Sequence, residues 1–296
     1  MNKKIRIGCA SGFWGDTDIA APQIIEKGNV HYLVCDYLSE VTMSILSRAR
    51  LKSDENGYAK DFINHVGPLL KTIKQNKIKV ISNAGGVNLD ACKKALSNQA
   101  KKENINLKII TVEGDDLSGI QKDLNKMPIK EIDSEEPLPE SILSINAYLG
   151  APGIKRALDQ GADIVITGRC VDSALALGPL MHEFNWEENE YDLLASGSLA
   201  GHIIECGAQS TGGNFTDWEI IDNFEDIGFP IVEVEENGEF IVTKPEGTGG
   251  IVNFGTIAEQ LLYEIGDPGA YILPDVICDF TNVNINNLGN DVVHVS

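Results

Sequence analysis

The chain has 296 residues, and its 44 acidic side chains against 24 lysines and arginines give a formal net charge of −20. This charge excludes bare nucleic acid as a partner, because such binding depends on basic side chains that neutralise phosphates. No membrane partner is predicted either, because the longest apolar runs fall well short of the ~20 residues that a membrane-spanning helix needs.

Short runs rich in β-branched residues alternate with helical patterns through the first half of the chain. Strands are predicted at Ile5–Ala10, Val30–Cys35, Ile78–Ser82 and Leu107–Val112, and helices at Ile19–Lys27, Glu40–Ala49, Ala59–Gln75 and Asp90–Glu103. Such alternation is typical of right-handed crossover units. It predicts an α/β fold with a mostly parallel sheet and flanking helices.

The segment 128–141 is acidic, contains two prolines and lacks periodicity, so it predicts a loop or linker. It is either an excursion from a single large α/β domain spanning 1–296 or a hinge between two lobes, 1–127 and 142–296. The regular pattern then resumes. A helix is predicted at Asn146–Gln160, a strand at Gly161–Thr167, and helices at Asp172–Phe184 and Tyr191–Cys206.

The last third predicts a β-hairpin insertion, with strands Ile231–Val234 and Phe240–Thr243 around a short EENG turn. A helix at Thr256–Glu264 and a strand at Val276–Phe280 follow. The strand-like alternation of 291–296 ends without a closing element, which favours a truncated chain or an edge strand equally. The six scattered cysteines form no C-x-x-C pair and indicate free thiols in a reducing cytoplasm.

Polar residues follow the predicted strand that ends at Thr167, and in open α/β sheets ligands bind at the carboxyl ends of strands. Arg169 is suited to hold a carboxylate or phosphate through two parallel hydrogen bonds. Asp172 would orient Arg169 or act as a base, and Ser173 would bind substrate. The alternative is a helix cap at Asp172 or Ser173 and a structural ion pair at Arg169.

The sequence NAGGVN follows another predicted strand and opens a helix. Backbone amides at Gly85 and Gly86, with Asn83 and Asn88 beside them, would bind an anion at the helix N-terminus. The alternative is a tight turn. Asp16 and Asp36 follow the first two strands and add candidate substrate-binding carboxylates. Asp16 with Asp18 could hold Mg²⁺, but a helix start is favoured, and no metal site is predicted.

His202 and Glu205 are three residues apart, so they share one face of a predicted helix. Either would move a proton. A zinc site using them lacks a second ligand pair and the H-E-x-x-H spacing, and a buried, hydrogen-bonded His202 is favoured.

Two glycine-rich loops complete the candidate set. Lys244 at the start of KPEGTGG would close with its loop over a substrate and bind an anion or act as a base. The alternative is a simple hairpin exit. The binding candidates in the two loops are Thr211, Gly212, Gly213, Glu246, Thr248, Gly249 and Gly250.

Several ordered motifs together resemble one family. GFWGD, DYLSEVTM, NAGGVN, NAYLGA, ITGRCVDSALALGPLMHEF, LAGHIIECGAQSTGGNF, GFPIVEV, TKPEGTGGIV and DPGAYILPDV are similar to the acyclic terpene utilisation (AtuA) family over nearly the whole chain. The resemblance implies catabolism of branched acyclic terpenoids such as citronellol and geraniol through acyl-CoA intermediates, or related carboxylate or acyl-CoA catabolism. Family members carry further sequence, in many a C-terminal domain, so it also implies a partner C-terminal domain or subunit.

The combined prediction is an enzyme acting on a small anionic carboxylate or an acyl-CoA, as a lyase, hydratase or isomerase. Arg169 and the amides of 83–86 would hold the anion, Asp172, Glu205 or His202 would move a proton, and 244–250 would close the site. No cofactor is assigned beyond acyl-CoA as a substrate. The alternative is a non-catalytic acyl-CoA-binding or partner subunit, and a homo-oligomer is left open.

Overall fold

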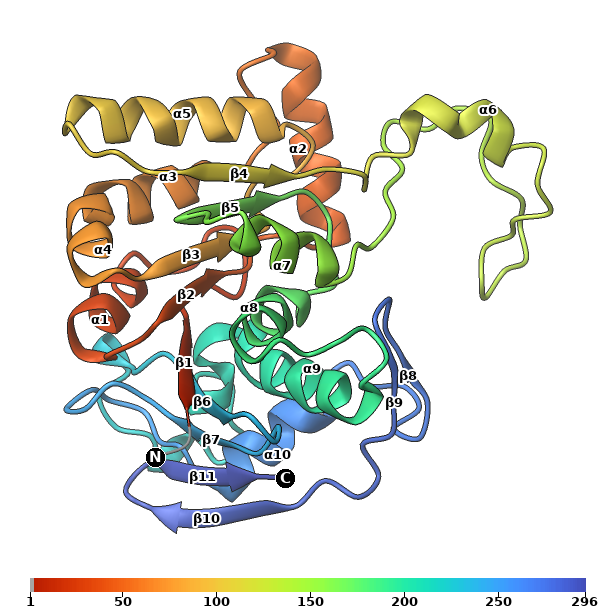
Figure 1. Ribbon diagram of the computed structural model, residues 1–296. Helices are drawn as coiled ribbons and strands as arrows, with labels where there is room; N and C mark the ends of the chain where they lie inside the picture. The colour runs from red at the N-terminus through yellow and green to blue at the C-terminus, as the bar shows by residue number, and fades with distance from the viewer. Residues whose placement is uncertain (1–2) are drawn as a thin grey trace.

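The computed structural model describes residues 3–296, and within them nine strands form one mixed sheet in the order β10-β11-β7-β6-β1-β2-β3-β5-β4. Its parallel core consists of β1 (Lys4–Cys9), β2 (Tyr32–Cys35), β3 (Lys79–Ser82), β5 (Ile164–Thr167) and β4 (Ile109–Val112). The arrows of β3, β4 and β5 point to the same side in Figure 1. The predicted α/β fold is therefore confirmed.

The other strands of the sheet are antiparallel. The predicted hairpin, β6 (Ile231–Glu235) and β7 (Phe240–Thr243), joins the sheet next to β1, followed by β11 (Val292–Val295) and β10 (Ile285–Gly289). The sequence INNLG of β10 has no apolar alternation, so it was not predicted. Separately, β8 (Tyr271–Ile272) and β9 (Ile277–Cys278) form a small hairpin.

Helices cover both faces of the sheet. One core cluster holds residues of α1 (Ala20–Lys27), α2 (Glu40–Lys52), α3 (Lys60–Val66), α4 (Leu70–Asn76) and α5 (Leu89–Lys102). The other holds residues of α7 (Pro152–Asp159), α8 (Ala174–Phe184), α9 (Tyr191–Glu205) and α10 (Phe254–Leu262). Leu33 and Cys35 of β2 face the first cluster, whereas Tyr32 and Val34 face the second. Burial on both faces explains the unbroken apolar runs of the parallel strands.

Two predicted helices differ from the structure. The helix predicted at Ala59–Gln75 is divided by a 3₁₀ turn at Gly67–Leu69, where Pro68 lacks the amide that would continue it. The helix predicted from Asn146 begins only at Pro152, a residue that suits a first helical turn. The preceding residues are extended, and Leu149 bridges to Cys170. None of the helices in residues 3–296 is long and apolar enough to span a bilayer.

Residues 113–148, here called the arm, leave the sheet after β4 and return towards α7 and β5. The two stems pair at Asp116 and Asn146, and the arm carries the short helix α6 (Gln121–Leu124). No residue from 116 to 150 is buried. Figure 1 shows the part around α6 standing away from the rest of the molecule. The predicted linker, 128–141, lies in this arm, and the strands on either side of it pair with each other in the sheet.

Candidate active site

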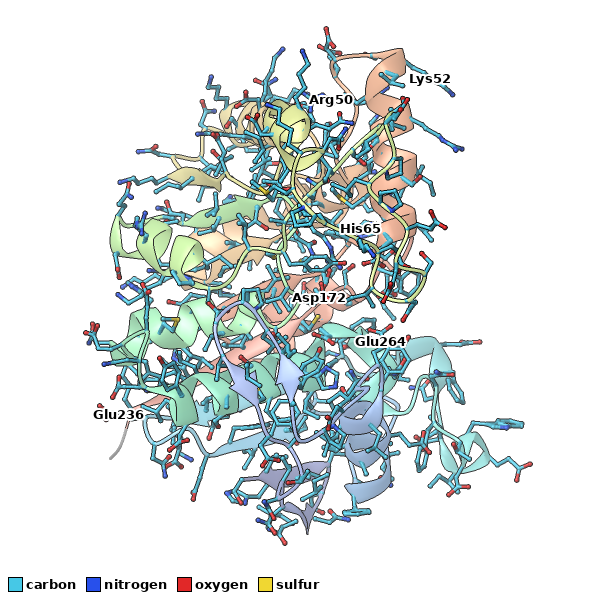
Figure 2. The ribbon with its side chains drawn as sticks, turned by 90° about the vertical axis from the view of Figure 1, so that its right-hand side faces the viewer. Arg50, Lys52, His65, Asp172, Glu236 and Glu264 are labelled. Carbon is cyan, nitrogen blue, oxygen red and sulfur yellow. The ribbon has the colours of Figure 1, made fainter. Side chains whose placement is uncertain are left out.

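A cavity of about 550 Å³ opens at the carboxyl edge of the parallel strands. Its polar lining comes from the segments after β1, β2 and β5 and from the end of α9. Figure 2 looks onto this edge, with Asp172 and Glu264 near the middle of the face. The lining residues are Gly12, Phe13, Asp36, Leu38, Ser39, Glu40, Tyr148, Arg169, Val171, Asp172, Glu205, Cys206, Gln209, Tyr263, Glu264, Tyr271, Ile272, Leu273 and Pro274.

Arg169 is buried beside the cavity and is held mainly by the protein itself. Its Nη1 donates to Asp172 Oδ1 at 2.8 Å and to the Leu38 carbonyl at 3.0 Å. Its guanidinium carbon lies 4.2 Å from the centre of the Tyr148 ring. Burial alone would lower the pKa of Arg169, but Asp172 and Tyr148 together raise it above its ordinary value, so the side chain stays charged. The contacts fit the structural ion pair that the sequence left as the alternative, and they leave little of Arg169 to hold a substrate anion.

Asp36, which is buried, and Asp172, which is half-buried, form a carboxyl pair. Asn83 Nδ2 donates to Asp36 Oδ1 at 2.6 Å, and the Asp172 carboxyl is within hydrogen-bonding reach of Asp36. Burial, and then the charge of Asp172, raises the pKa of Asp36 well above its ordinary value. Burial also raises the pKa of Asp172, although Arg169 opposes this. Two carboxyl groups in such contact share a proton.

Glu205 and His202 form a second pair on α9, as their spacing predicted. His202 Nδ1 lies 2.9 Å from Glu205 Oε1. Burial raises the pKa of Glu205 to about 7 although His202 lowers it. Burial alone would lower the pKa of His202, but Glu205, together with backbone hydrogen bonding at Leu261 and Gln260, gives a net upward shift. Both shifts favour the protonated forms of the pair.

This pairing predicts a pH dependence of folding. The folded pKa of Glu205, about 7, exceeds its ordinary value of 4.5, so the folded state binds more protons between these values and stability falls as the pH rises. The raised pKa of His202 acts in the same direction, because its contribution is lost as the pH rises through the folded pKa. The free energy of unfolding of Glu205→Gln, relative to that of the wild type, should therefore rise by roughly 3 kcal/mol between pH 5 and pH 8.

Urea unfolding at pH 5, 6, 7 and 8 measures this difference. Glu225→Gln, at an exposed position, is the control and should follow the wild type at every pH. If the free energy of unfolding depends on pH in the same way for the wild type and for Glu205→Gln, the raised pKa of Glu205 is contradicted.

The NAGGVN turn is structural, and this corrects the predicted anion site. The amides of Gly85, Gly86 and Asn88 donate to the carbonyls of Thr167, Asn83 and Gly85 at 3.0, 3.2 and 2.8 Å. Asn88 caps α5 by accepting from the Ala91 amide at 3.2 Å. A Cβ on Gly85 would stand 2.6 Å from the Thr167 oxygen, so glycine is needed for this close approach of the turn to the end of β5. Of this motif, Asn83 alone supports the cavity, through Asp36.

The two glycine-rich loops lie outside the cavity lining and pack against each other. Lys244 is buried and its ammonium contacts the Thr248 carbonyl at 2.7 Å and Asp291 Oδ2 at 3.1 Å. The amide of Ile251 donates to the Thr211 carbonyl at 2.9 Å. These contacts match the hairpin-exit alternative and give no support to a lid or to Lys244 as a base. Glu246 is exposed and does not line the cavity. The other binding candidates of the two loops are also absent from the lining, namely Thr211, Gly212, Gly213, Thr248, Gly249 and Gly250.

Asp16 and Ser173 lie near the cavity without lining it. Asp16 Oδ2 accepts from the Gly12 amide at 2.9 Å and so holds the turn after β1. Ser173 is buried at the start of α8, and its hydroxyl lacks a hydrogen-bond partner among the described residues. In residues 3–296, no group of three or more His, Cys, Asp or Glu side chains is arranged to hold a metal ion.

Sequence reasoning missed Glu40, Tyr148, Glu264 and the apolar rim. Glu40 begins α2 after the Ser39 cap and accepts a hydrogen bond from the Tyr148 hydroxyl. Hydrogen bonding by Tyr148 lowers the pKa of Glu40. The rim includes Phe13 and the β8–β9 hairpin, and Tyr271 packs with its ring centre 6.0 Å from that of His202. The position of Glu40 after a predicted strand was a usable signal, whereas the Tyr148 contact depends on the course of the arm.

The family comparison covers the whole of this site. A family model described as Acyclic terpene utilisation family protein AtuA matches residues 5–296. The chain belongs to this family. The resemblance found in the sequence motifs is thereby confirmed, and the AtuA match includes every residue that lines the cavity. Comparisons with curated proteins and with solved structures found no match.

Proposed function

We propose that this AtuA-family chain is an enzyme that moves protons on an acyl group carried as a coenzyme A thioester, as a hydratase, lyase or isomerase. The observation that carries the proposal is that three carboxyl groups, Asp36, Asp172 and Glu205, line one cavity at the carboxyl edge of the sheet. Asp36 and Asp172 form one proton-sharing pair, and Glu205 forms the other with His202, which is buried behind it. We also propose a cytoplasmic location, which the free state of all six cysteines supports.

General acid–base catalysis works best with groups whose pKa lies near the operating pH. The Glu205 carboxyl, with a pKa of about 7, meets that condition, and the Asp36–Asp172 pair holds a proton well above the ordinary carboxyl range. One pair can donate a proton while the other accepts one. This is the pattern needed to add or remove water, to break a carbon–carbon bond, or to shift a double bond.

The charge of the cavity favours a thioester over a free carboxylate as the reacting end. Five carboxyl side chains line it, and Arg169 is the one lysine or arginine among the lining residues. Arg169 is already paired with Asp172, so a carboxylate would enter against net repulsion. A neutral thioester avoids that cost, while the phosphates of coenzyme A would stay outside. Of the two substrate classes expected from the sequence, a free carboxylate and an acyl-CoA, this argument favours the acyl-CoA.

The rim of the cavity suits a hydrocarbon chain. Phe13, Ile272 and Leu273 lie at its edge, with Tyr263 and Tyr271 beside them. Phe13 and Ile272 are exposed, so their apolar surface is available to a ligand. Small-molecule sites commonly combine such apolar walls with a few convergent polar groups.

Thermal unfolding with a ligand panel tests the proposal. The panel holds the coenzyme A thioesters of citronellic and geranic acids, the free acids, coenzyme A alone, nucleotides and divalent metals. A thioester at a hundred times its dissociation constant should add about 2.7 kcal/mol to stability. Free acids should give a smaller shift. Stabilisation by the free acids alone would contradict the thioester assignment.

The second candidate function is a non-catalytic acyl-CoA-binding or partner subunit. The exposed apolar side chains of the arm favour an assembly with another protein surface. Such a subunit would bind a thioester but would tolerate loss of the proton-sharing pairs. Turnover by the purified chain, abolished by substitution at Asp36, would exclude this candidate.

A further inference from the structure

We propose that the arm and the outward face of α2 form an interface between two copies of this chain. The proposal is independent of the reaction in the cavity. It rests on the lack of a core in the arm, on an uncovered apolar and basic helix face, and on the complementary charges of the two surfaces.

The arm carries apolar side chains that the described chain does not cover. Ile132 is 91% exposed, and Ile120, Met127, Ile129 and Leu143 are exposed as well. The side-chain hydrogen bonds and ion pairs of 117–143 stay within the arm, for example Lys126 with Asp123 and Gln121 with Glu140. Ordering each residue costs roughly 1–2 kcal/mol of backbone entropy. Burial against another surface would offset that cost.

The outward face of α2 is the second uncovered surface. Met43 and Leu46 point into the core, whereas Val41 is 69% exposed, Ile45 is exposed and Leu51 is 75% exposed. The spacing of Val41 and Ile45 puts them on one face of the helix. Arg48 and Lys52 continue that face and are also exposed. Figure 2 shows Lys52 near the upper end of α2.

The charges of the two surfaces are complementary. The outer part of the arm is acidic, with Glu131, Asp133, Glu135 and Glu136 around Ile132. The outward face of α2 presents Arg48 and Lys52 among its apolar side chains, in a chain whose net charge is −20. Complementary charge orients an encounter while apolar contacts supply affinity.

A second copy supplies both surfaces at once. In a twofold arrangement, the acidic part of each arm would lie on α2 of the other copy, and the same patch would be used twice. A groove of about 370 Å³ lies between α2 and the base of the arm. It is lined in part by Leu51, Val87 and Leu143, so it can accommodate an apolar side chain of the other copy. Since α2 begins at Glu40 on the cavity edge, the interface would lie next to the cavity mouth.

Sedimentation equilibrium of the full chain from 1 to 100 µM tests the interface. We expect a dimer. The variants Ile132→Asp and Arg48→Glu/Lys52→Glu should each weaken it at least ~30-fold, the effect of an interface hot spot. Combining Arg48→Glu/Lys52→Glu with Glu135→Lys/Glu136→Lys should restore much of the affinity, because the charges are exchanged. Leu288→Asp, at an exposed position on β10, is the control and should leave the dimer unchanged.

Thermal unfolding of each variant at low concentration verifies that the protomer folds. A wild-type chain that stays monomeric to 100 µM would overturn the proposal. So would a dimer that survives Ile132→Asp and the α2 charge reversal. A second experiment measures sedimentation with vesicles of anionic lipid. A monomer that pellets with them through Arg48 and Lys52 would overturn the dimer and assign this face of α2 to a membrane surface instead.

Discussion

Asp36→Asn should reduce turnover of a coenzyme A thioester by about 10²–10⁴-fold, the usual contribution of a general acid or base. The amide keeps the shape of the side chain and can still accept the hydrogen bond from Asn83, but it cannot share a proton with Asp172. Because burial disfavours the charged form of Asp36, the variant should be at least as stable as the wild type near neutral pH. Steady-state rates and urea unfolding, measured on the same preparation, separate the two effects.

Asp16→Asn is the matched control for this experiment. Asp16 lies after the neighbouring strand and accepts backbone hydrogen bonds from Gly12 and Thr17, without lining the cavity. Its substitution should change turnover by only a few-fold. If Asp36→Asn retains wild-type turnover, the carboxyl pair is not the source of the proton and the proposed reaction class is wrong.

Arg169→Leu should lower the free energy of unfolding by about 3–5 kcal/mol, the cost of leaving a buried charge without its partner. Arg169 is the cation that faces Asp172 and approaches Glu40, and its loss leaves carboxyl groups without a counter-charge. Adding Asp172→Asn should recover part of the loss, since the amide needs no counter-charge. Urea unfolding of the wild type, both single variants and the double variant gives the coupling energy directly.

Arg156→Leu controls for the loss of an arginine as such. Arg156 is exposed on α7, so its substitution should change stability by less than about 0.5 kcal/mol. Additive effects of Arg169→Leu and Asp172→Asn would show that the pair does not interact across the cavity wall. Arg169 would then retain a role in binding a substrate anion, as first expected from its position after β5.

Local pattern was sufficient to predict the parallel core and one of the two proton-sharing pairs. The core strands are apolar on both faces, and Glu205 and His202 are brought together by one helix. The pairing of Asp36 with Asp172 could not be predicted in this way, because it depends on which strands are neighbours. β3 lies between β2 and β5, so the two aspartates meet only where the segments after β2 and β5 reach across the end of β3, and there Arg169 donates to the Leu38 carbonyl at 3.0 Å.

The predicted anion site failed for a related physical reason. A glycine-rich turn before a helix exposes amides in isolation, but here Gly85 and Gly86 donate to carbonyls of neighbouring segments. Which amides remain free depends on the packing of β5 against β3, and the sequence of the turn does not contain that information. The same limit applies to Lys244, whose buried contact with Asp291 joins the exit of β7 to the last residues of the described chain.

The paired stems of the arm have a consequence for how this fold can vary. Because Asp116 and Asn146 bridge at the point where the chain leaves and rejoins the body, the ends of everything between them stay fixed whatever its length. Lengthening a surface loop between fixed ends costs little, about 0.6 kcal/mol for each doubling. The part of the arm between these two residues can therefore change in length or sequence, and so in the surface that it offers a partner, without moving Tyr148 or the carboxyl groups of the cavity.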